Sequence, residues 1–200
     1  IITVVNEANA HEYPNFIDEI TDTFQPNQIS INLIRDIENP HAAAQLLDTY
    51  KAAVERYEWH IQHKTLTAFG YLGGMIVRAK ESVQKELIYR VMRFNEFVTP
   101  CTAGDLTYVI WEDGRVNACE MLPDTVGNII GNQPANNFRN IVASSAAQAL
   151  RKKIVAEKCK CSYECAMTIN TLFSWPLAKK LWWRVVSGKA SAPLPLPEQP

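Results

Sequence analysis

The stretch CTAGDLTYVIWEDGRVNAC, residues 101–119, decides the fold of the second half of this chain, because its pattern predicts a β-hairpin. Residues 106–111 and 116–121 are rich in β-branched and apolar side chains, which is typical of strands. Between them, Glu112-Asp113-Gly114-Arg115 is a turn sequence in which Gly114 supplies a positive φ. A hairpin folds back on itself, so we expect Cys101, before the first strand, to lie near Cys119 on the second.

A second group of thiols follows in CKCSYEC, residues 159–165. If a helix begins near Ser162, Cys161 and Cys165 are four residues apart and lie on one face, with Cys159 on the turn before it. Thiolates this close repel one another unless a cation holds them. The cluster therefore favours metal binding over packing as small hydrophobic side chains.

The cysteine count sets limits on the site. All five cysteines lie between Cys101 and Cys165, and disulfide pairing would leave one thiol over. The chain shows no secretion signal, so we expect a cytoplasmic location, where clustered thiols more often bind metal than each other. Five cysteines supply one site with four thiolates and not two, which makes Cys159 or Cys161 the extra residue.

Spacing alone does not separate a zinc site from an iron-sulfur cluster, since both accept four thiolates. A zinc-binding structural or interaction module without catalysis is therefore one alternative. A plain α/β domain with buried thiols and no metal is another.

The first half predicts a βαβ unit. Residues 1–6 are β-branched and predict a strand buried on both faces, residues 14–24 have helical periodicity, and residues 28–34 predict a second strand. Two strands do not make a stable sheet, so we expect neighbouring strands upstream and interpret the chain, which begins at Ile1, as a fragment. Helices are predicted over residues 40–62 and 71–93, the second firm only after Gly74.

The remaining segments are predicted from their composition and from the positions of prolines, which interrupt helices. Residues 134–158 predict one alanine-rich helix, residues 162–173 a short helix, and residues 187–200, with four prolines, a disordered or extended tail. Residues 173–184 are aromatic and basic, but Pro176 is expected to break the helix that a membrane-surface role would need. We expect these aromatics to pack over the thiol site instead.

Charge and hydropathy exclude some partners. Lys and Arg number 20 against 21 Asp and Glu, a formal net charge of −1, which argues for no nucleic acid. No window reaches the roughly 18 consecutive apolar residues of a membrane-spanning helix, so no membrane partner is expected.

The hairpin sequence also carries a resemblance to a known family. Twelve residues separate Cys101 from Gly114 and four separate Gly114 from Cys119, a spacing similar to the signature of the SPASM-type extension of radical S-adenosylmethionine enzymes. Gly127-Asn128-Ile129 resembles that family's Gly-Asn-Leu step, and residues 159–165 with the following Asn170 and Leu172-Phe173 resemble its closing cysteine run. Residues 3–6 and 29–35 are similar to the last strands of its partial barrel.

The resemblance implies an α/β fold with four parts. These are the closing βαβ of a partial (β/α) barrel over residues 1–39, a helical connection over 40–98, a small iron-sulfur domain with the β-hairpin over 99–186, and the tail over 187–200. It also implies an oxidoreductase or modifying enzyme in which a [4Fe-4S] cluster reduces S-adenosylmethionine to methionine and a 5′-deoxyadenosyl radical. The CxxxCxxC loop that holds that cluster is absent from these 200 residues. The implied centre here is thus one auxiliary [4Fe-4S] cluster.

The resemblance also implies roles for particular residues. Cys101, Cys119 and Cys165 are its principal ligands, and Cys159 and Cys161 complete the candidates. Arg35, at the carboxyl end of a strand, is expected to contact the carboxylate or ribose of S-adenosylmethionine, or else to form a surface salt bridge. The implied partners are an unidentified peptide, protein or small-molecule substrate and an electron donor such as flavodoxin or ferredoxin.

Overall fold

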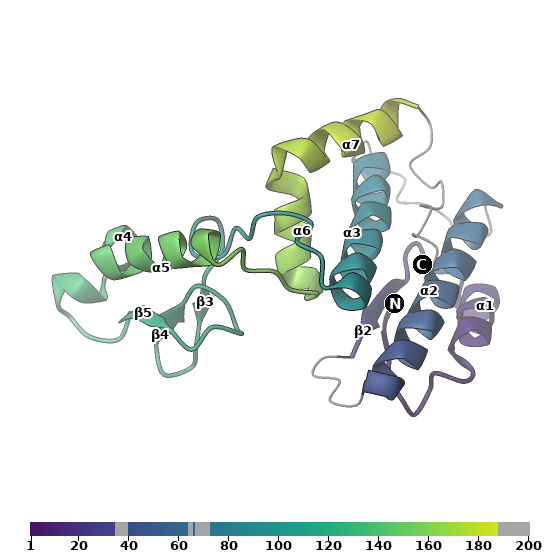
Figure 1. Ribbon diagram of the computed structural model, residues 1–200, viewed down its shortest axis with the longest axis horizontal. Coiled ribbons are helices and arrows are strands. Elements are labelled where there is room, and N and C mark those ends of the chain that lie inside the picture. Colours follow the sequence, from purple (N-terminus) through teal and green to yellow (C-terminus); the bar gives the residue numbers. More distant parts are fainter. Residues whose placement is uncertain (35–39, 64–65, 67–72, 188–200) are drawn as a thin grey trace. The chain divides into compact units, whose positions relative to one another are not determined.

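The computed structural model describes residues 1–34, 40–63, 66 and 73–187, without the side chains of residues 40–42. The chain divides into two compact units, unit 1 from residues 1–96 and 162–200 and unit 2 from residues 97–161. Both helices and small sheets are present, so the α/β class is confirmed (Figure 1). Unit 1 contains β1 (Ile2–Val5), α1 (Tyr13–Phe24), β2 (Ser30–Leu33), α2 (Pro40–Gln62), α3 (Gly74–Phe94), α6 (Glu164–Phe173) and α7 (Trp175–Val186). Unit 2 contains β3 (Val109–Ile110), β4 (Arg115–Asn117), β5 (Thr125–Asn128), the 3-10 helix η1 (Pro134–Asn136), α4 (Phe138–Ala143) and α5 (Ser145–Ala156).

The predicted βαβ unit is confirmed. Strands β1 and β2 pair in parallel, with Ile2 opposite Ser30, and α1 makes the crossover. Helix α1 has Pro14 in its first turn and ends where Gln25 adopts a φ of 44° and donates its N–H to the carbonyl of Thr21 at 3.0 Å.

The expectation that the first strand is buried on both faces is wrong. Ile2 is 76% exposed and Val4 43% exposed, while Val5 is buried. Successive side chains of a strand point to opposite faces, and among the described residues only β1 and β2 form this sheet. One face of β1 is therefore uncovered, and the partial barrel remains a prediction.

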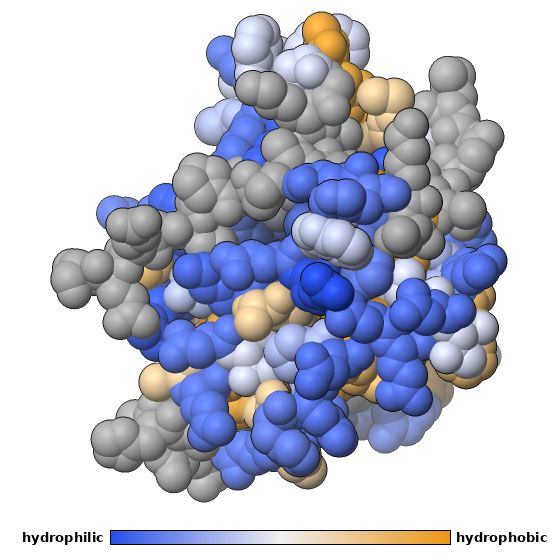
Figure 2. Space-filling view, turned by 90° about the vertical axis from the view of Figure 1, so that its right-hand side faces the viewer, coloured by the Kyte–Doolittle hydropathy of each residue, from blue (hydrophilic) through white to orange (hydrophobic). Residues whose placement is uncertain are grey.

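Helix α3 is the centre of unit 1. It packs against α2, α6 and α7, and Figure 1 shows it between α2 and the α6–α7 pair. Figure 2 views the unit from the side of α1 and α2, where the described surface is mostly hydrophilic. The outward faces of these helices thus meet water, whereas α3 is enclosed.

Helix α7 corrects the expectation about Pro176. The proline does not interrupt the helix, because it lies in the first turn, where its missing N–H has no intrahelical acceptor. Leu177 and Leu181 are buried, but Trp175, Trp182 and Trp183 are 74%, 70% and 69% exposed. Nothing among the described residues of unit 1 covers these three indoles, and their expected packing over the thiol site stays a prediction. No helix among the described residues has both the length and the apolar character needed to cross a bilayer.

Unit 2 contains the predicted hairpin with shorter strands. Val109 lies opposite Asn117 and Ile110 opposite Val116 in an antiparallel pair. Gly114 has a φ of 80°, and its N–H donates to the carbonyl of Trp111 at 2.9 Å. A Cβ on Gly114 would lie 2.5 Å from the Ile130 side chain, so glycine is required by both conformation and space.

A third strand, β5, extends this sheet and was not predicted. It pairs antiparallel with β4, with a bulge at Val116 and Asn117. Gly127 of β5 lies under Ile141 of α4, whose side-chain carbons would come within 2.8 Å of an added Cβ. The glycine therefore allows α4 to approach the sheet closely.

The single helix predicted over residues 134–158 is instead divided into η1, α4 and α5. Asn137 caps α4 by accepting from the N–H of Arg139 at 3.0 Å, and Ser144 caps α5 by accepting from the N–H of Ala147 at 3.2 Å. Asn and Ser compete for backbone groups in this way and start new helices.

Gly127→Ala is expected to destabilise unit 2 by about 2 kcal/mol, because the added methyl group overpacks against Ile141. Urea unfolding followed by circular dichroism measures the change. In Gly127→Ala combined with Ile141→Ala, the two losses should be less than additive, since the second change removes the atoms that clash. Additive losses would contradict the packing argument.

Candidate metal centre

Cys101 begins a tight loop that leads into β3. Within this loop Gly104 has a φ of 75° and donates its N–H to the carbonyl of Thr107 at 2.9 Å, and Leu106 donates to the carbonyl of Thr102 at 2.9 Å. Tyr108 closes the loop by donating its hydroxyl to the carbonyl of Gly104. These local bonds fix the backbone that follows Cys101.

Arg151 of α5 holds this loop against the helices of unit 2. Its Nε donates to the carbonyl of Gly104, and its Nη2 donates to the hydroxyl of Tyr108 at 2.6 Å and to the carbonyl of Val142, at the end of α4, at 2.6 Å. One guanidinium thus links three segments with its fixed fork of donors. Cys101 is thereby placed relative to α5.

Cys119 lies just after β4, in the loop to β5. Asn117 organises this loop, because its buried side chain donates to the carbonyl of Leu122 at 3.0 Å and accepts from the hydroxyl of Thr125 at 3.1 Å. An ion pair of 3.4 Å between Lys153 and Asp124 connects the loop to α5. The strand ends before the cysteine, contrary to the prediction that Cys119 lies within it.

Cys159 is positioned by the end of α5. Lys158 adopts a φ of 49°, its N–H donates to the carbonyl of Val155 at 3.1 Å, and the N–H of Cys159 donates to the carbonyl of Ile154 at 3.0 Å. This pair of bonds is a Schellman motif, which turns the chain back across the helix end. Cys159 consequently packs against the core of unit 2, as Cys101 and Cys119 do.

The structure brings the thiols of Cys101 and Cys159 into hydrogen-bonding contact. That hydrogen bond, followed by burial and by the charges of neighbouring thiolates including Cys161 and Cys119, raises the pKa of Cys159 well above the usual thiol range. All four side chains are half-buried. The other three cysteines of unit 2 thus all act on the ionisation of Cys159.

These thiols fit a soft metal in number and type, because four thiolates are the donor set of closed zinc sites and of cubane clusters. Their arrangement is looser than that of a formed site. Within the described ranges, no three His, Cys, Asp or Glu side chains converge closely enough to enclose a metal ion. The structure thus shows a pairwise contact between the Cys101 and Cys159 thiols. Among the described residues it does not show three or more ligands gathered at the distances of a metal ion.

The other predicted site residues lie elsewhere. Cys165 is exposed, near the start of α6, and belongs to unit 1. Its predicted role as a ligand stays a prediction. Arg35 lies outside the described residues.

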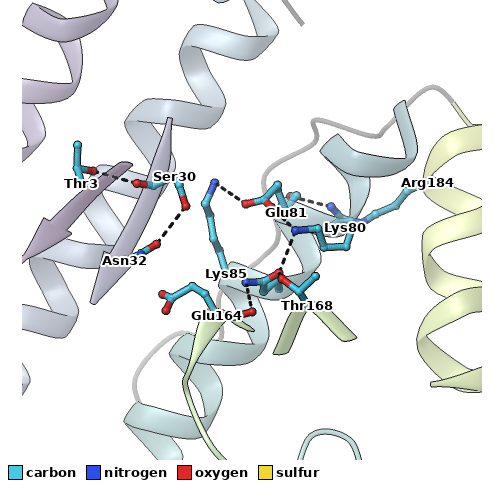
Figure 3. Close-up of polar contacts among 11 residues, drawn as sticks. Thr3, Ser30, Asn32, Lys80, Glu81, Lys85, Glu164, Thr168 and Arg184 are labelled. Carbon is cyan, nitrogen blue, oxygen red and sulfur yellow. Dashed lines mark hydrogen bonds and ion pairs between the residues drawn. The ribbon is translucent and has the colours of Figure 1, made fainter. Parts of the chain in front are cut away.

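Unit 1 contains a buried charge cluster that the sequence did not reveal. Lys85 of α3 is 3% exposed and lies 4.0 Å from a carboxylate oxygen of Glu81 (Figure 3). Its Nζ also lies 3.9 Å from the centre of the Tyr57 ring. Its Nζ has no hydrogen-bond acceptor among the described residues. Burial lowers the pKa of Lys85, and burial likewise raises the pKa of Glu58 on α2.

The same helix is joined to α6 and α7 by polar contacts. Gln84 accepts from the hydroxyl of Thr168 at 2.9 Å, and Ser82 accepts from Arg184 at 3.0 Å. Glu86 pairs with Lys180 at 2.8 Å. In the sequence, the sign of this cluster is that polar residues occur on every face of α3. They can be interpreted as buried only when the helix is known to be enclosed.

Lys85→Met is expected to change how stability depends on pH. Because the pKa of Lys85 is lowered on folding, the unfolded chain binds more protons between the lowered value and 10.5, so this residue makes stability rise with pH across that window. The free energy of unfolding of the native chain should therefore rise relative to Lys85→Met as pH increases towards 10.5. Parallel pH profiles of the two proteins in urea unfolding would contradict burial as the cause.

Comparison of the chain with protein-family models, with curated proteins and with solved structures finds no match.

Proposed function

We propose that unit 2 binds one metal centre through the thiolates of Cys101, Cys119, Cys159 and Cys161. The observation that supports this most is the contact between the Cys101 and Cys159 thiols, with Cys119 and Cys161 close enough to affect the ionisation of Cys159. The neighbouring thiols raise the pKa of Cys159, and a bound cation would favour its thiolate form instead. The proposed set takes the four cysteines of unit 2, and Cys165, which belongs to unit 1, stays a predicted ligand outside this set.

We infer further that the centre is an auxiliary [4Fe-4S] cluster in the C-terminal part of a radical S-adenosylmethionine enzyme with a SPASM-type extension. The spacing of Cys101, Gly114 and Cys119 and the Gly127-Asn128 step support this. The same resemblance implies S-adenosylmethionine and a second [4Fe-4S] cluster in the intact enzyme, with Arg35 as the candidate contact to S-adenosylmethionine. When bound, the auxiliary cluster supplies a one-electron redox centre or helps to place the substrate.

The residues of this chain would bind and shield that centre. The thiolates are its ligands, and the buried side chains of Val116, Ala118 and Ile154 exclude water from the side on which the thiols pack. Arg151 and Asn117 hold the two loops that carry Cys101 and Cys119. The substrate of the intact enzyme is an unidentified peptide, protein or small molecule.

Anaerobic reconstitution of the chain with iron and sulfide, in competition with zinc, tests this function. We expect a brown protein with equal amounts of iron and sulfide. A colourless protein with zinc and no sulfide would instead support a four-cysteine structural or interaction module, since zinc accepts the same thiolates. A chain that retains neither metal would contradict both.

A further inference from the structure

The outward side of α7 is unusually apolar. Trp175, Trp182 and Trp183 are largely exposed, and Val186 is 61% exposed. Side chains that are three or four positions apart, or seven or eight, share one face of a helix. These four residues have that spacing, and the exposed Lys179 lies among them. We call the five residues the tryptophan face.

The opposite side of α7 attaches the helix to unit 1. Leu177, Leu181 and Arg184 are buried there, and α7 packs against α3 and α6. Arg184 donates to the hydroxyl of Ser82 on α3 at 3.0 Å. The tryptophan face is therefore turned away from this core, and its three indoles do not hold the helix in place. An exposed apolar patch of this kind marks a contact surface for another molecule.

The charge around the tryptophan face is positive. Residues 165–187 contain three cationic side chains and no carboxylate. The Nζ of Lys179 lies 5.4 Å from the centre of the Trp175 ring. Lys180 pairs with Glu86 of α3 at 2.8 Å, which leaves Lys179 as the cation of the face among the described residues. The favoured partner is thus anionic as well as apolar.

Positive charge alone does not select the partner, because residues 151–161 at the end of α5 are basic as well. The feature that distinguishes α7 is its three indoles, each of which is an apolar ring with one polar N–H. Such rings are enriched at the headgroup level of membranes, where the ring meets hydrocarbon and the N–H meets water or phosphate. A helix with an aromatic face and a lysine beside it is typical of proteins that lie on a lipid surface.

We propose that the tryptophan face docks onto the surface of an anionic phospholipid bilayer. The indoles would enter the headgroup region, and Lys179 would extend along them to a lipid phosphate. Helix α7 has 12 residues, which fits a position in the plane of the surface and is too short to cross a hydrocarbon core of about 30 Å. The proposal replaces the expectation of no membrane partner, because Pro176 lies in the first turn of α7 and does not break it. It concerns unit 1 and goes beyond the metal centre of unit 2.

Two other occupants fit this face less well. A single-stranded nucleic acid binds aromatic side chains along a groove with several cations that follow the phosphate backbone. The tryptophan face carries one lysine among the described residues of α7. A second copy of the chain would bring Lys179 against another positive face, and like charges that meet in an interface cost affinity.

Co-sedimentation of the metal-free chain with vesicles tests the proposal. The vesicles contain phosphatidylcholine with about 30% phosphatidylglycerol, an anionic lipid. We expect the native chain to bind and its tryptophan emission to move to shorter wavelength. Trp182→Ala combined with Trp183→Ala should bind at least about tenfold more weakly, because two apolar rings no longer enter the bilayer. Both positions are exposed, so the fold should persist, and circular dichroism checks this.

Phe24→Ala is the matched control. Phe24 is a 67% exposed aromatic residue at the end of α1 in the same unit, outside the tryptophan face, so this variant should bind like the native chain. Lys179→Gln should bind anionic vesicles about fivefold more weakly, and it should bind vesicles of phosphatidylcholine alone as the native chain does. High salt should remove the difference on anionic vesicles.

Absence of vesicle binding, or equal binding by the native chain and the double tryptophan variant, would overturn the proposal. Acrylamide quenching that is no stronger in the free native chain than in the double variant would also overturn it, because another part of the chain would then cover the face. Tryptophan-dependent self-association, or binding of a DNA oligonucleotide, by a chain that does not bind vesicles would do the same. No metal is present in these measurements, so their outcome is separate from the iron and sulfide analysis that tests the proposed function.

Discussion

Cys159→Ser is expected to lose the metal centre of unit 2, whereas Cys165→Ser is expected to retain it. Structural thiolate sites bind metal with about 10–16 kcal/mol shared among four ligands, so loss of one thiolate weakens binding by about 3 kcal/mol, or about 100-fold. Serine keeps the size of the side chain but does not ionise to a comparable donor. Cys159 contacts Cys101, and Cys165 lies in the other compact unit.

Iron, sulfide and visible absorption after anaerobic reconstitution measure this difference. Circular dichroism of both metal-free variants serves as the control that each chain folds. Cys101→Ser and Cys119→Ser are expected to behave like Cys159→Ser. Equal iron content in Cys159→Ser and in the native chain, with loss of iron in Cys165→Ser, would reverse the proposed ligand set.

Arg151→Ala is expected to have the largest effect on the stability of unit 2, about 3 kcal/mol. The guanidinium makes charge-assisted hydrogen bonds to Gly104, Tyr108 and Val142, and its removal takes a donor from the Val142 carbonyl and leaves the Gly104 carbonyl with the Tyr108 hydroxyl. Lys in place of Arg should restore only part of the loss, because one ammonium group does not reproduce the fork.

Hydrogen exchange of the metal-free chain locates the effect. Amides of the loop between Cys101 and Tyr108 should exchange faster in Arg151→Ala, while those of α1 and α3 in unit 1 should be unchanged. Lys152→Ala, at the neighbouring exposed position, is the matched control and should leave exchange as in the native chain. Uniform acceleration across both units would show that Arg151 acts on the whole fold rather than on the loop.

Much of the fold could be predicted because local chemistry determines it. Gly114 sets the hairpin turn, and the change from strand to helical periodicity reveals the βαβ unit. Strand β5 was missed because Gly127 and Asn128 have low strand propensity and are present for packing and turn contacts. Ser144 separates α4 from α5 because it lies at a helix start, and Pro176 fits into α7 because it lies in the first turn. Both outcomes depend on helix boundaries, which are hard to predict from sequence.

The candidate site was predicted in part. The hairpin placed Cys101 and Cys119 in one unit, but the sequence predicted Cys159 or Cys161 as the extra cysteine. The position of Cys159 depends on a Schellman motif with Lys158 at the residue where glycine is usual, so the sequence carries no clear mark of it. The enclosure of Lys85 likewise depends on other helices, because Tyr57 comes from α2 and Glu164 from α6.

Three cysteine-bearing segments of unit 2 are fixed by separate contacts, namely the Arg151 fork, the Asn117 side chain and the end of α5. Much of the conformational entropy that is lost when the thiols come together is therefore lost during folding, before any metal binds. A site organised in this way differs from a zinc finger, in which the metal itself drives folding. Metal loss from unit 2 should thus be reversible, with the empty protein able to accept a new centre without first refolding.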